Sequence, residues 1–286
     1  MAQGYILQLL SIVLNAVALL LNKFTLTSLP ISMVSLGNIV CSLLICVSFY
    51  NEVKASISWQ ILRLCAPIAI VNTIGVISLY YCMYHLSPMF YGLLSRFYII
   101  FSLILAVVFL KESFSRKQIY FILLSIIGCI FFMARDKIEH VEIMPILGCL
   151  LSCFCFALSY MMTKMQSVRL NPKIIFFYNN LIGLLPIGIY FMCIDNTLVF
   201  PQLVDCIFIF GSAISFFMSM IYFFKGLESI PFGRANVLRS LSPIVLASIS
   251  MPFFPEKFSL LNIAGAILIL ISLTCLGVQN GRKRTV

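Results

Sequence analysis

The sequence predicts an all-α integral membrane protein in which ten transmembrane helices form two inverted five-helix repeats. Three observations support this prediction: the composition, the length of the apolar stretches, and a second half that repeats features of the first. Hydrophobic residues make up 62% of the 286 residues, charged residues make up 10%, and the mean hydropathy is +1.10. A soluble chain of this length needs a far more polar surface, so we expect a bilayer as its solvent.

Ten stretches are apolar enough to cross the hydrocarbon core of a bilayer, which takes roughly 20 residues of helix. Their continuous apolar character argues against membrane β-strands, which alternate over about ten residues. The connections are short, so no soluble domain is expected. The expected spans are 4–22, 31–50, 64–85, 88–110, 118–134, 143–165, 174–194, 203–225, 231–254 and 260–279.

The positions of the basic residues predict the orientation of these helices. Lysine and arginine together number 19, against 9 acidic residues. With a cytoplasmic amino terminus, and with Arg96 and Arg239 left aside, 13 basic residues lie at cytoplasmic ends and four at outer ends. An excess of basic residues is typical of cytoplasmic loops, so we expect both termini to be cytoplasmic. We expect the protein to be a multi-pass protein of a cell membrane, most simply a bacterial inner membrane. Because topology explains the basic excess, nucleic acid is not an expected partner.

Two arginines occupy the same place in the two halves of the chain. Arg96 and Arg239 each lie inside an apolar stretch, eight residues after Pro88 and Pro231 respectively. A guanidinium cannot lose its charge at membrane depth, so it persists only beside water, a counter-charge or a ligand. We expect both arginines to line a central cavity that receives an anionic group. The structural alternative is that they pair with backbone carbonyls at helix ends.

Further matched pairs extend this repeat along the chain at offsets of 141 to 144 residues. Because five spans is an odd number, the second unit enters the membrane from the opposite side, which is the geometry of many alternating-access transporters. The pairs are Asn22-Lys23 with Thr163-Lys164, Asn38 with Asn180, Tyr81 with Tyr222, and Leu110-Lys111-Glu112 with Phe254-Pro255-Glu256.

The repeat sets the expected domain boundaries. The first five-span unit is expected at residues 1–136 and the second at residues 143–281. An external linker at 137–142 separates them, and a basic cytoplasmic tail follows at 282–286.

With two five-span repeats and a carboxylate after spans four and nine, the chain resembles the EamA-type branch of the drug/metabolite transporter superfamily. The motifs are Phe109-Leu110-Lys111-Glu112 before a helix with Gly128, and Phe254-Pro255-Glu256 before a helix that contains Gly265. Lys111 and Pro255 replace the small residue that usually precedes each carboxylate. The resemblance implies a transporter of amino acids, nucleotide-linked metabolites or other small organic solutes, and it implies no cofactor.

Four other polar residues join the arginines as candidate substrate-binding residues. Lys23 and Lys164 end spans one and six at matched positions, although a lysine there also reaches the lipid headgroups easily. Asn38 and Asn180 place amides inside spans two and seven, where each needs a partner. That partner is either the cargo or a neighbouring helix.

Three tyrosines complete the candidate set. Tyr81 and Tyr84 lie near the end of span three, and Tyr222 is the repeat partner of Tyr81. Their rings suit a planar or cationic cargo, and tyrosine is also enriched at membrane interfaces for reasons unrelated to binding.

These features favour a secondary-active transporter of a small organic metabolite with an anionic group, and not an enzyme. A membrane enzyme acting on lipid or isoprenoid substrates is one alternative, but it would ordinarily show clustered carboxylates for a metal or a base. An efflux pump for apolar or cationic compounds is another, and it would favour acids inside the spans. The sequence shows neither pattern, and it leaves open coupling to protons or to an exchanged substrate.

We predict that position 116 is cytoplasmic and that position 135 is external. Arg116→Cys and Arg135→Cys are each made in a variant without the 11 native cysteines. Labelling of each new cysteine then shows on which side of the membrane its position lies. A membrane-impermeant maleimide applied to intact cells should label position 135 and spare position 116. Labelling of position 116 from outside would overturn the orientation.

Overall fold

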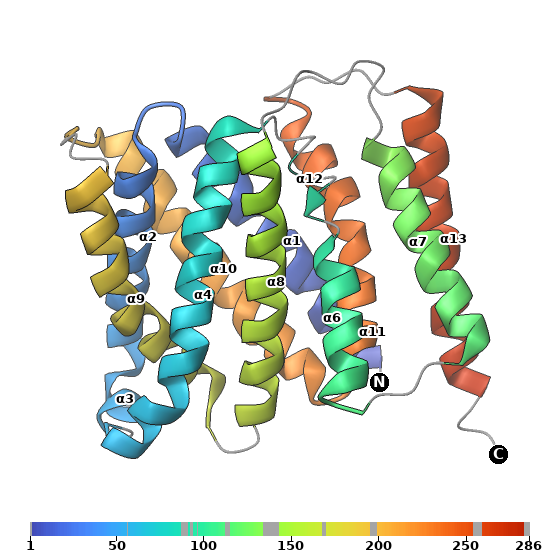
Figure 1. Ribbon diagram of the computed structural model, residues 1–286, viewed down its shortest axis with the longest axis horizontal. Coiled ribbons are helices and arrows are strands. Elements are labelled where there is room, and N and C mark those ends of the chain that lie inside the picture. The colour runs from blue at the N-terminus through green and yellow to red at the C-terminus, as the bar shows by residue number, and fades with distance from the viewer. Residues whose placement is uncertain are drawn as a thin grey trace.

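The described residues of the computed structural model fold into one bundle of helices with no strand among them (Figure 1). They comprise residues 2–55, 57–86, 91, 94–95, 97–111, 115–133, 143–167, 170–194, 199–253 and 259–282. Arg96, Glu112, Glu256 and the expected linker 137–142 lie outside them. The elements are α1 (Ala2–Thr25), α2 (Ile31–Cys46), η1 (Val47–Phe49), α3 (Tyr50–Ala55), α4 (Trp59–His85), α6 (Phe97–Val108), α7 (Arg116–Met133), α8 (Ile143–Gln166), α9 (Pro172–Ile194), α10 (Leu203–Leu227), α11 (Phe232–Leu238), η2 (Arg239–Leu241), α12 (Ser242–Ser250) and α13 (Leu260–Arg282).

Six of the described helices are long and apolar enough to cross a membrane. Three shorter apolar helices, Phe97–Val108, Ile119–Gly128 and Leu260–Ser272, fall on other expected spans. An all-helical membrane protein is therefore confirmed, and the count of ten crossing helices stays a prediction. The six long spans are Gln3–Thr25, Ile31–Lys54, Trp59–His85, Ile143–Gln166, Pro172–Met192 and Leu203–Leu227.

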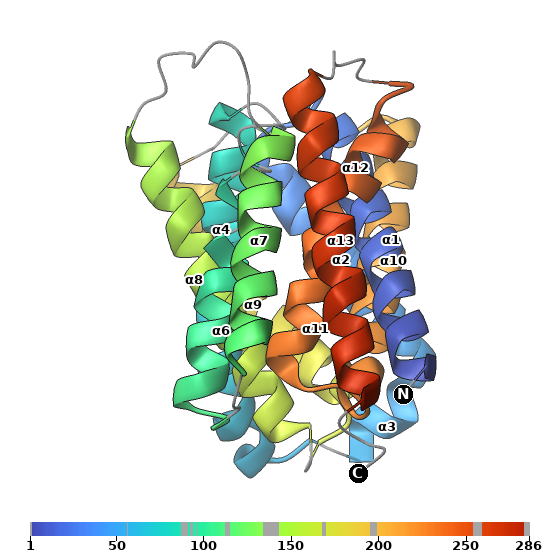
Figure 2. The same ribbon diagram turned by 90° about the vertical axis from the view of Figure 1, so that its right-hand side faces the viewer.

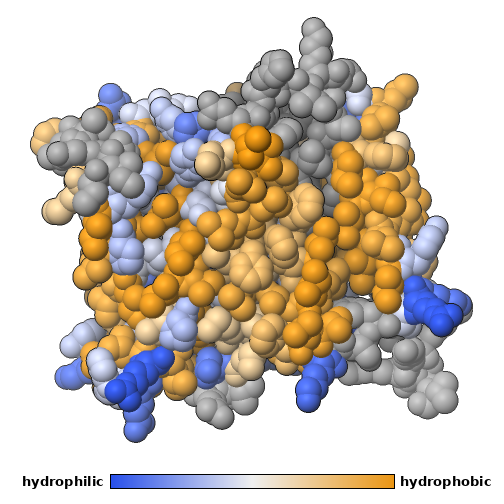
Figure 3. Space-filling model, viewed as in Figure 1, coloured by the Kyte–Doolittle hydropathy of each residue, from blue (hydrophilic) through white to orange (hydrophobic). Residues whose placement is uncertain are grey.

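One face of the bundle carries a broad apolar band above a hydrophilic lower edge. Figure 3 shows hydrophobic side chains over the middle of the bundle and the most hydrophilic atoms along its lower edge. At this lower edge α1 begins and α13 ends, so both lie at one end of the bundle (Figure 1). Basic residues mark the helix ends there, among them Lys54 in α3, Arg116 in α7 and Lys225 in α10.

The pattern of contacts between helices stays the same when each helix of the first five-span unit is exchanged with the corresponding helix of the second unit. Under this exchange α1 pairs with α8, α2 with α9, α4 with α10, α6 with α11 and α12, and α7 with α13. The contact of α1 with α10 then matches that of α4 with α8, and the contact of α2 with α10 matches that of α4 with α9. The α2–α9 and α7–α13 contacts map onto themselves. The arrangement fits a two-repeat architecture.

Aromatic side chains pack together at the end of the bundle where α1 begins. Phe49 and Phe217 stack with ring centroids 5.6 Å apart, and Phe217 meets Phe176 edge-on at 5.0 Å. Tyr160 and Phe223 lie 5.6 Å apart in the same cluster. We call this group the aromatic cluster; its rings are Phe49, Tyr160, Phe176, Phe217, Phe223, Phe224 and Phe232.

The expected span 231–254 is interrupted rather than one regular helix. A tight 3₁₀ turn, η2, separates α11 from α12 at Arg239. Pro243 explains the turn, because it lies four residues after Arg239 and has no N–H to donate to the Arg239 carbonyl. The N–H of Ser242 donates to that carbonyl instead. The interruption therefore falls at Arg239, one of the two arginines that occupy matching positions in the repeat.

Lys111 adopts a left-handed backbone conformation with φ of 52° just after α6. This conformation costs a residue with a side chain about 1–2 kcal/mol, which glycine avoids. Lys111 therefore bears a backbone cost that a glycine at this position would not.

Helices α7 and α13 form a closely packed pair at one side of the bundle, as both views show (Figures 1 and 2). Gly128 permits the approach: a Cβ atom there would lie 3.0 Å from the carbonyl oxygen of Gly265 and from the backbone nitrogen of Ile269. Backbone atoms cannot move aside as a flexible side chain can, so this contact needs glycine.

We predict that Gly128→Ala lowers stability by about 1–3 kcal/mol, because the added methyl overpacks the α7–α13 contact. Gly188→Ala is the matched control, since a Cβ there meets nothing within 4 Å. It should be neutral or stabilising by up to about 1 kcal/mol, because alanine favours helix over glycine. Thermal unfolding of both purified variants in one detergent provides the comparison. Equal midpoints for the two variants would contradict the assigned contact.

Candidate functional site

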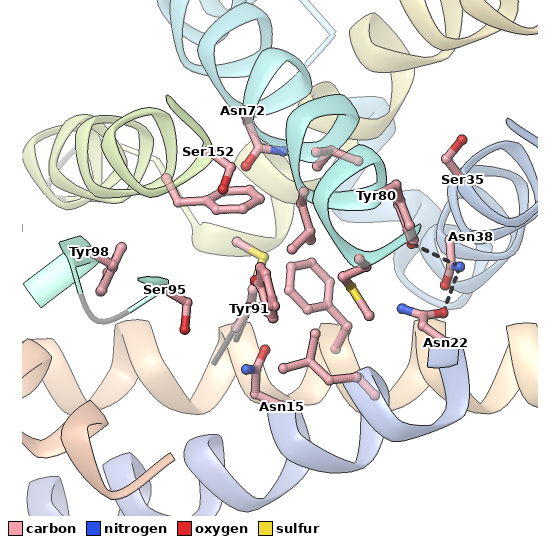
Figure 4. Close-up of a pocket in the computed structure, with 18 of the residues that line it drawn as sticks. Asn15, Asn22, Ser35, Asn38, Asn72, Tyr80, Tyr91, Ser95, Tyr98 and Ser152 are labelled. Atoms are coloured by element: carbon pink, nitrogen blue, oxygen red, sulfur yellow. Dashed lines mark hydrogen bonds between the residues drawn. The ribbon is translucent and has the colours of Figure 1, made fainter. Parts of the chain in front are cut away.

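A cavity of about 300 Å³ lies among the central helices. Residues of α1, α2, α4, α6, α8, α9, α10, η2 and α12 line it, whereas the described residues of α7 and α13 do not. Figure 4 shows polar side chains placed around apolar and aromatic ones. Six asparagines supply amides: Asn15, Asn22, Asn38, Asn72, Asn179 and Asn180. Seven aromatic rings also line it: Tyr80, Tyr91, Tyr98, Phe156, Tyr160, Phe176 and Phe216.

The cavity extends toward the end of the bundle opposite the start of α1. Its lining includes Lys23 in the last turn of α1, Leu86 just after α4, and Ser250 at the end of α12. At the other end the aromatic cluster fills the space between the helices, and Tyr160 and Phe176 belong to both the cluster and the lining. The structure is therefore packed shut at the end where α1 begins.

Among the described residues, the charged side chains of the cavity lining are basic. Lys23 and Arg239 are the charged residues in its lining, and no aspartate or glutamate among the described residues accompanies them. Within that part of the chain, the half-buried Lys23 makes no hydrogen bond or ion pair. Guanidinium and ammonium groups are common protein partners of carboxylate and phosphate groups.

Arg239 lies against three aromatic rings from three helices. Its guanidinium carbon is 4.0 Å from the ring centroid of Phe223 in α10, 5.2 Å from that of Tyr160 in α8 and 5.9 Å from that of Tyr98 in α6. Tyr98 is held in turn by its hydroxyl, which donates a hydrogen bond of 2.7 Å to Oδ1 of Asn236. These cation–π contacts offset part of the cost of burying the charge.

One wall of the cavity is built from a hydrogen-bonded network around Asn38. The Nδ2 of Asn38 lies 2.9 Å from Oδ1 of Asn22 and 3.2 Å from the hydroxyl of Tyr80 (Figure 4). The hydroxyl of Ser212 lies 2.9 Å from the same Oδ1 of Asn22. The network joins α1, α2, α4 and α10, so polar groups of this wall are fixed before any cargo arrives.

The repeat partner of Asn38 has a matching local geometry. Asn180 donates from Nδ2 to the carbonyl of Phe176, four residues earlier, at 2.8 Å. Asn38 donates likewise to the carbonyl of Val34 at 2.9 Å. Beside Asn180, the buried Oδ1 of Asn179 has no hydrogen-bond partner among the described residues.

Four of the expected site residues line the cavity: Arg239, Lys23, Asn38 and Asn180. Their roles in binding stay predictions. Arg96, the repeat partner of Arg239, lies outside the described residues.

Lys164, Tyr81, Tyr84 and Tyr222 do not contribute to the lining. Lys164 lies toward the closed end, with its Nζ 6.0 Å from the ring of Phe232. Tyr84 is 61% exposed, and Tyr81 packs against a neighbouring histidine. None of the four residues therefore lines the cavity in this conformation.

Helical phase explains why Tyr80 lines the cavity and Tyr81 does not. The cavity-lining residues of α4 are Asn72, Thr73, Val76, Leu79, Tyr80 and Met83, which recur every three or four residues on one face. Tyr81, one residue after Tyr80, points away from that face. The recurring pattern was visible in the sequence, but the face that it would turn toward the cavity was not.

Comparisons with known proteins give a family and a fold. The sequence model of the EamA-like transporter family matches residues 2–134 and again residues 143–278. A solved structure described only as "Crystal structure of protein" superposes with a TM-score of 0.80 at 10% identity, covering 99% of each chain. At this identity the likeness concerns the fold alone. Among curated proteins, no sequence matches the chain.

We predict that a cysteine at position 242 reacts from the side opposite the termini, whereas a cysteine at position 235 does not. Ser242 lines the cavity in the middle of the bundle, and Ala235 is fully buried against the aromatic cluster. Ser242→Cys and Ala235→Cys, made without native cysteines, are treated with a membrane-impermeant thiol reagent from that side. Faster modification at position 235 than at 242 would show that the cavity opens at the other end.

Proposed function

The chain belongs to the EamA-like transporter family, and from this premise we propose that it is a secondary-active transporter of a small organic anion. The observation that carries the proposal is Arg239, a permanent cation in the wall of a mostly apolar cavity. Lys23 adds a second cation nearer the mouth. Two basic side chains in one cavity attract an anionic cargo.

The form of Arg239 suits a carboxylate or a phosphate. A guanidinium presents its N–H donors in a planar fork that matches two oxygens of such a group, whereas a lysine is a point charge. A charge-assisted hydrogen bond contributes about 1.5–3 kcal/mol. Amides from six asparagines and rings from seven aromatic residues then provide neutral contacts for the remainder of a small organic molecule.

The arrangement of the helices supports alternating access. Its contact pattern is preserved under exchange of the two five-helix units, yet its cavity reaches one end and is packed shut at the other. A second conformation in which the two units exchange roles would turn the cavity toward the other side. The proposal includes ten crossing helices, repeat units at 1–136 and 143–281 joined by the linker 137–142, and a cell-membrane location with both termini cytoplasmic.

Transport by the purified protein tests the proposal directly. Proteoliposomes are loaded with a panel of small organic anions and with neutral analogues of each, and efflux and exchange are followed with and without an imposed proton gradient. Selective transport of anions supports the proposal, and the gradient distinguishes proton coupling from exchange. Transport that favours the neutral analogues throughout would remove the anionic cargo.

We predict that Arg239→Ala weakens binding of the transported anion by about tenfold to a hundredfold, the equivalent of losing one charge-assisted hydrogen bond. Arg96→Ala is expected to act in the same way. Arg239→Lys should fall between the alanine variant and the unaltered protein, because it keeps charge but loses the planar fork. Affinity is measured by calorimetry on protein in nanodiscs.

Arg234→Ala is the matched control, since Arg234 lies in α11 and outside the cavity lining. It should leave the affinity unchanged. Each variant is first shown to be folded by its thermal unfolding midpoint. Unchanged affinity in both Arg96→Ala and Arg239→Ala would remove these residues from the binding site.

A further inference from the structure

Three of the six asparagines in the cavity lining have side chains that make no hydrogen bond within the described part of the chain. Asn15 of α1 and Asn72 of α4 are half-buried. Asn179 of α9 is only 7% exposed, and its Oδ1 is buried without a partner among the described residues. The side chains of the other three are bonded to neighbouring protein groups: Asn22, Asn38 and Asn180. The lining therefore contains two kinds of amide, of which one kind has no structural partner in the described residues.

The three unpartnered amides reach the cavity from three different helices. In Figure 4 the side chains of Asn72 and Asn15 extend from opposite sides into the space between α4 and α1. Asn179 belongs to α9, which packs against α4. Polar groups thus approach one mostly apolar cavity from several directions, which is typical of a site that orients a small molecule.

These amides are also the asparagines of the lining at which the two repeat units differ most in chemistry. The helices are related by offsets of 141 or 142 residues, and at those offsets a residue without a polar side chain stands in the other unit: Phe156 for Asn15, Ala213 for Asn72 and Gly37 for Asn179. Asn38 and Asn180, by contrast, match each other and share a local geometry. A cargo without twofold symmetry requires groups that differ between two units related by such an axis.

The chemistry of a carboxamide limits which cargo it can select. Its oxygen accepts hydrogen bonds, and its NH₂ group donates up to two. A half-turn of the terminal torsion exchanges the two ends, so each asparagine can offer the cavity either a donor or an acceptor. The complementary cargo group also donates and accepts, as an amide or a hydroxyl does. A hydrocarbon group that displaces water from these amides replaces none of their hydrogen bonds and loses affinity.

We propose that Asn15, Asn72 and Asn179 form a hydrogen-bonding subsite that selects organic anions carrying an amide or hydroxyl group over anions with a hydrocarbon body. The subsite rests on the proposed function, because it recognises the neutral part of an anionic cargo. Rings of the lining such as Phe156 contact the apolar remainder.

Two anions of matched shape test this selection. N-benzoylglycinate carries a carboxylate, an amide and a ring, and 4-phenylpentanoate has the same shape with hydrocarbon in place of the amide. N-benzoylglycinamide keeps the amide and lacks the charge. Binding is measured by calorimetry on the full chain in nanodiscs. The unaltered protein should bind N-benzoylglycinate about tenfold to a hundredfold more tightly than 4-phenylpentanoate, because amides left unpaired beside hydrocarbon are costly.

Leucine replaces each amide by an apolar side chain of similar size. Asn15→Leu, Asn72→Leu and Asn179→Leu should each lower the preference for N-benzoylglycinate over 4-phenylpentanoate by about threefold to tenfold. Val76→Leu is the matched control, since Val76 lines the cavity one turn from Asn72 and offers no hydrogen bond. It should leave the preference unchanged. Thermal unfolding midpoints show which variants are folded, and the comparison of the two anions on the unaltered protein needs no variant.

The outcomes separate the subsite from the proposed function. Equal affinities of the unaltered protein for the two anions would overturn the subsite, and so would a preference that persists in all three leucine variants. The anion site stands in both cases if the anions bind more tightly than N-benzoylglycinamide. If N-benzoylglycinamide binds as tightly as N-benzoylglycinate, the anionic cargo fails, whereas weaker binding of both amides by the leucine variants still supports the subsite. Failure of all three compounds to bind would overturn the subsite.

Discussion

The permanent charge of Arg239 inside an apolar bundle is the constraint around which the centre of this protein is organised. Since a guanidinium cannot be neutralised by losing a proton, protein groups, water or a ligand must stabilise it. Rings from α6, α8 and α10 surround it, and two of them, Tyr160 and Phe223, belong to the cluster that fills one end of the bundle. The environment of one cation and the closure of the cavity therefore depend on the same side chains.

Polar side chains hold the helices together where the hydrophobic effect cannot. In lipid the backbone groups are satisfied within each helix, and apolar surfaces gain little by leaving lipid for one another. The α1–α10 pair accordingly uses Gln8 on the Phe223 carbonyl and a hydroxyl contact of 3.1 Å between Ser11 and Ser219. The Asn38 network joins four helices in the same way. These bonds make the cavity wall rigid and the helix contacts specific.

The helix contacts are symmetric, but the cavity is not. Lys23 lines it, whereas its repeat partner Lys164 lies near Phe232 at the closed end. Because the cavity reaches only one end of the bundle, equivalent residues of the two units lie in different surroundings. If the transporter alternates as proposed, each single conformation must show such a difference between paired residues.

The sequence alone determined the class, the repeat and several cavity residues. Apolar length identified the spans, and the matched offset identified Asn38 and Asn180, which share one local geometry. Only the tertiary structure decided that Tyr80 rather than Tyr81 faces the cavity, and that Phe223 lies behind Arg239. The physical reason is that sequence spacing fixes which residues share a helix face, whereas packing against other helices fixes where that face points and which distant side chains meet it.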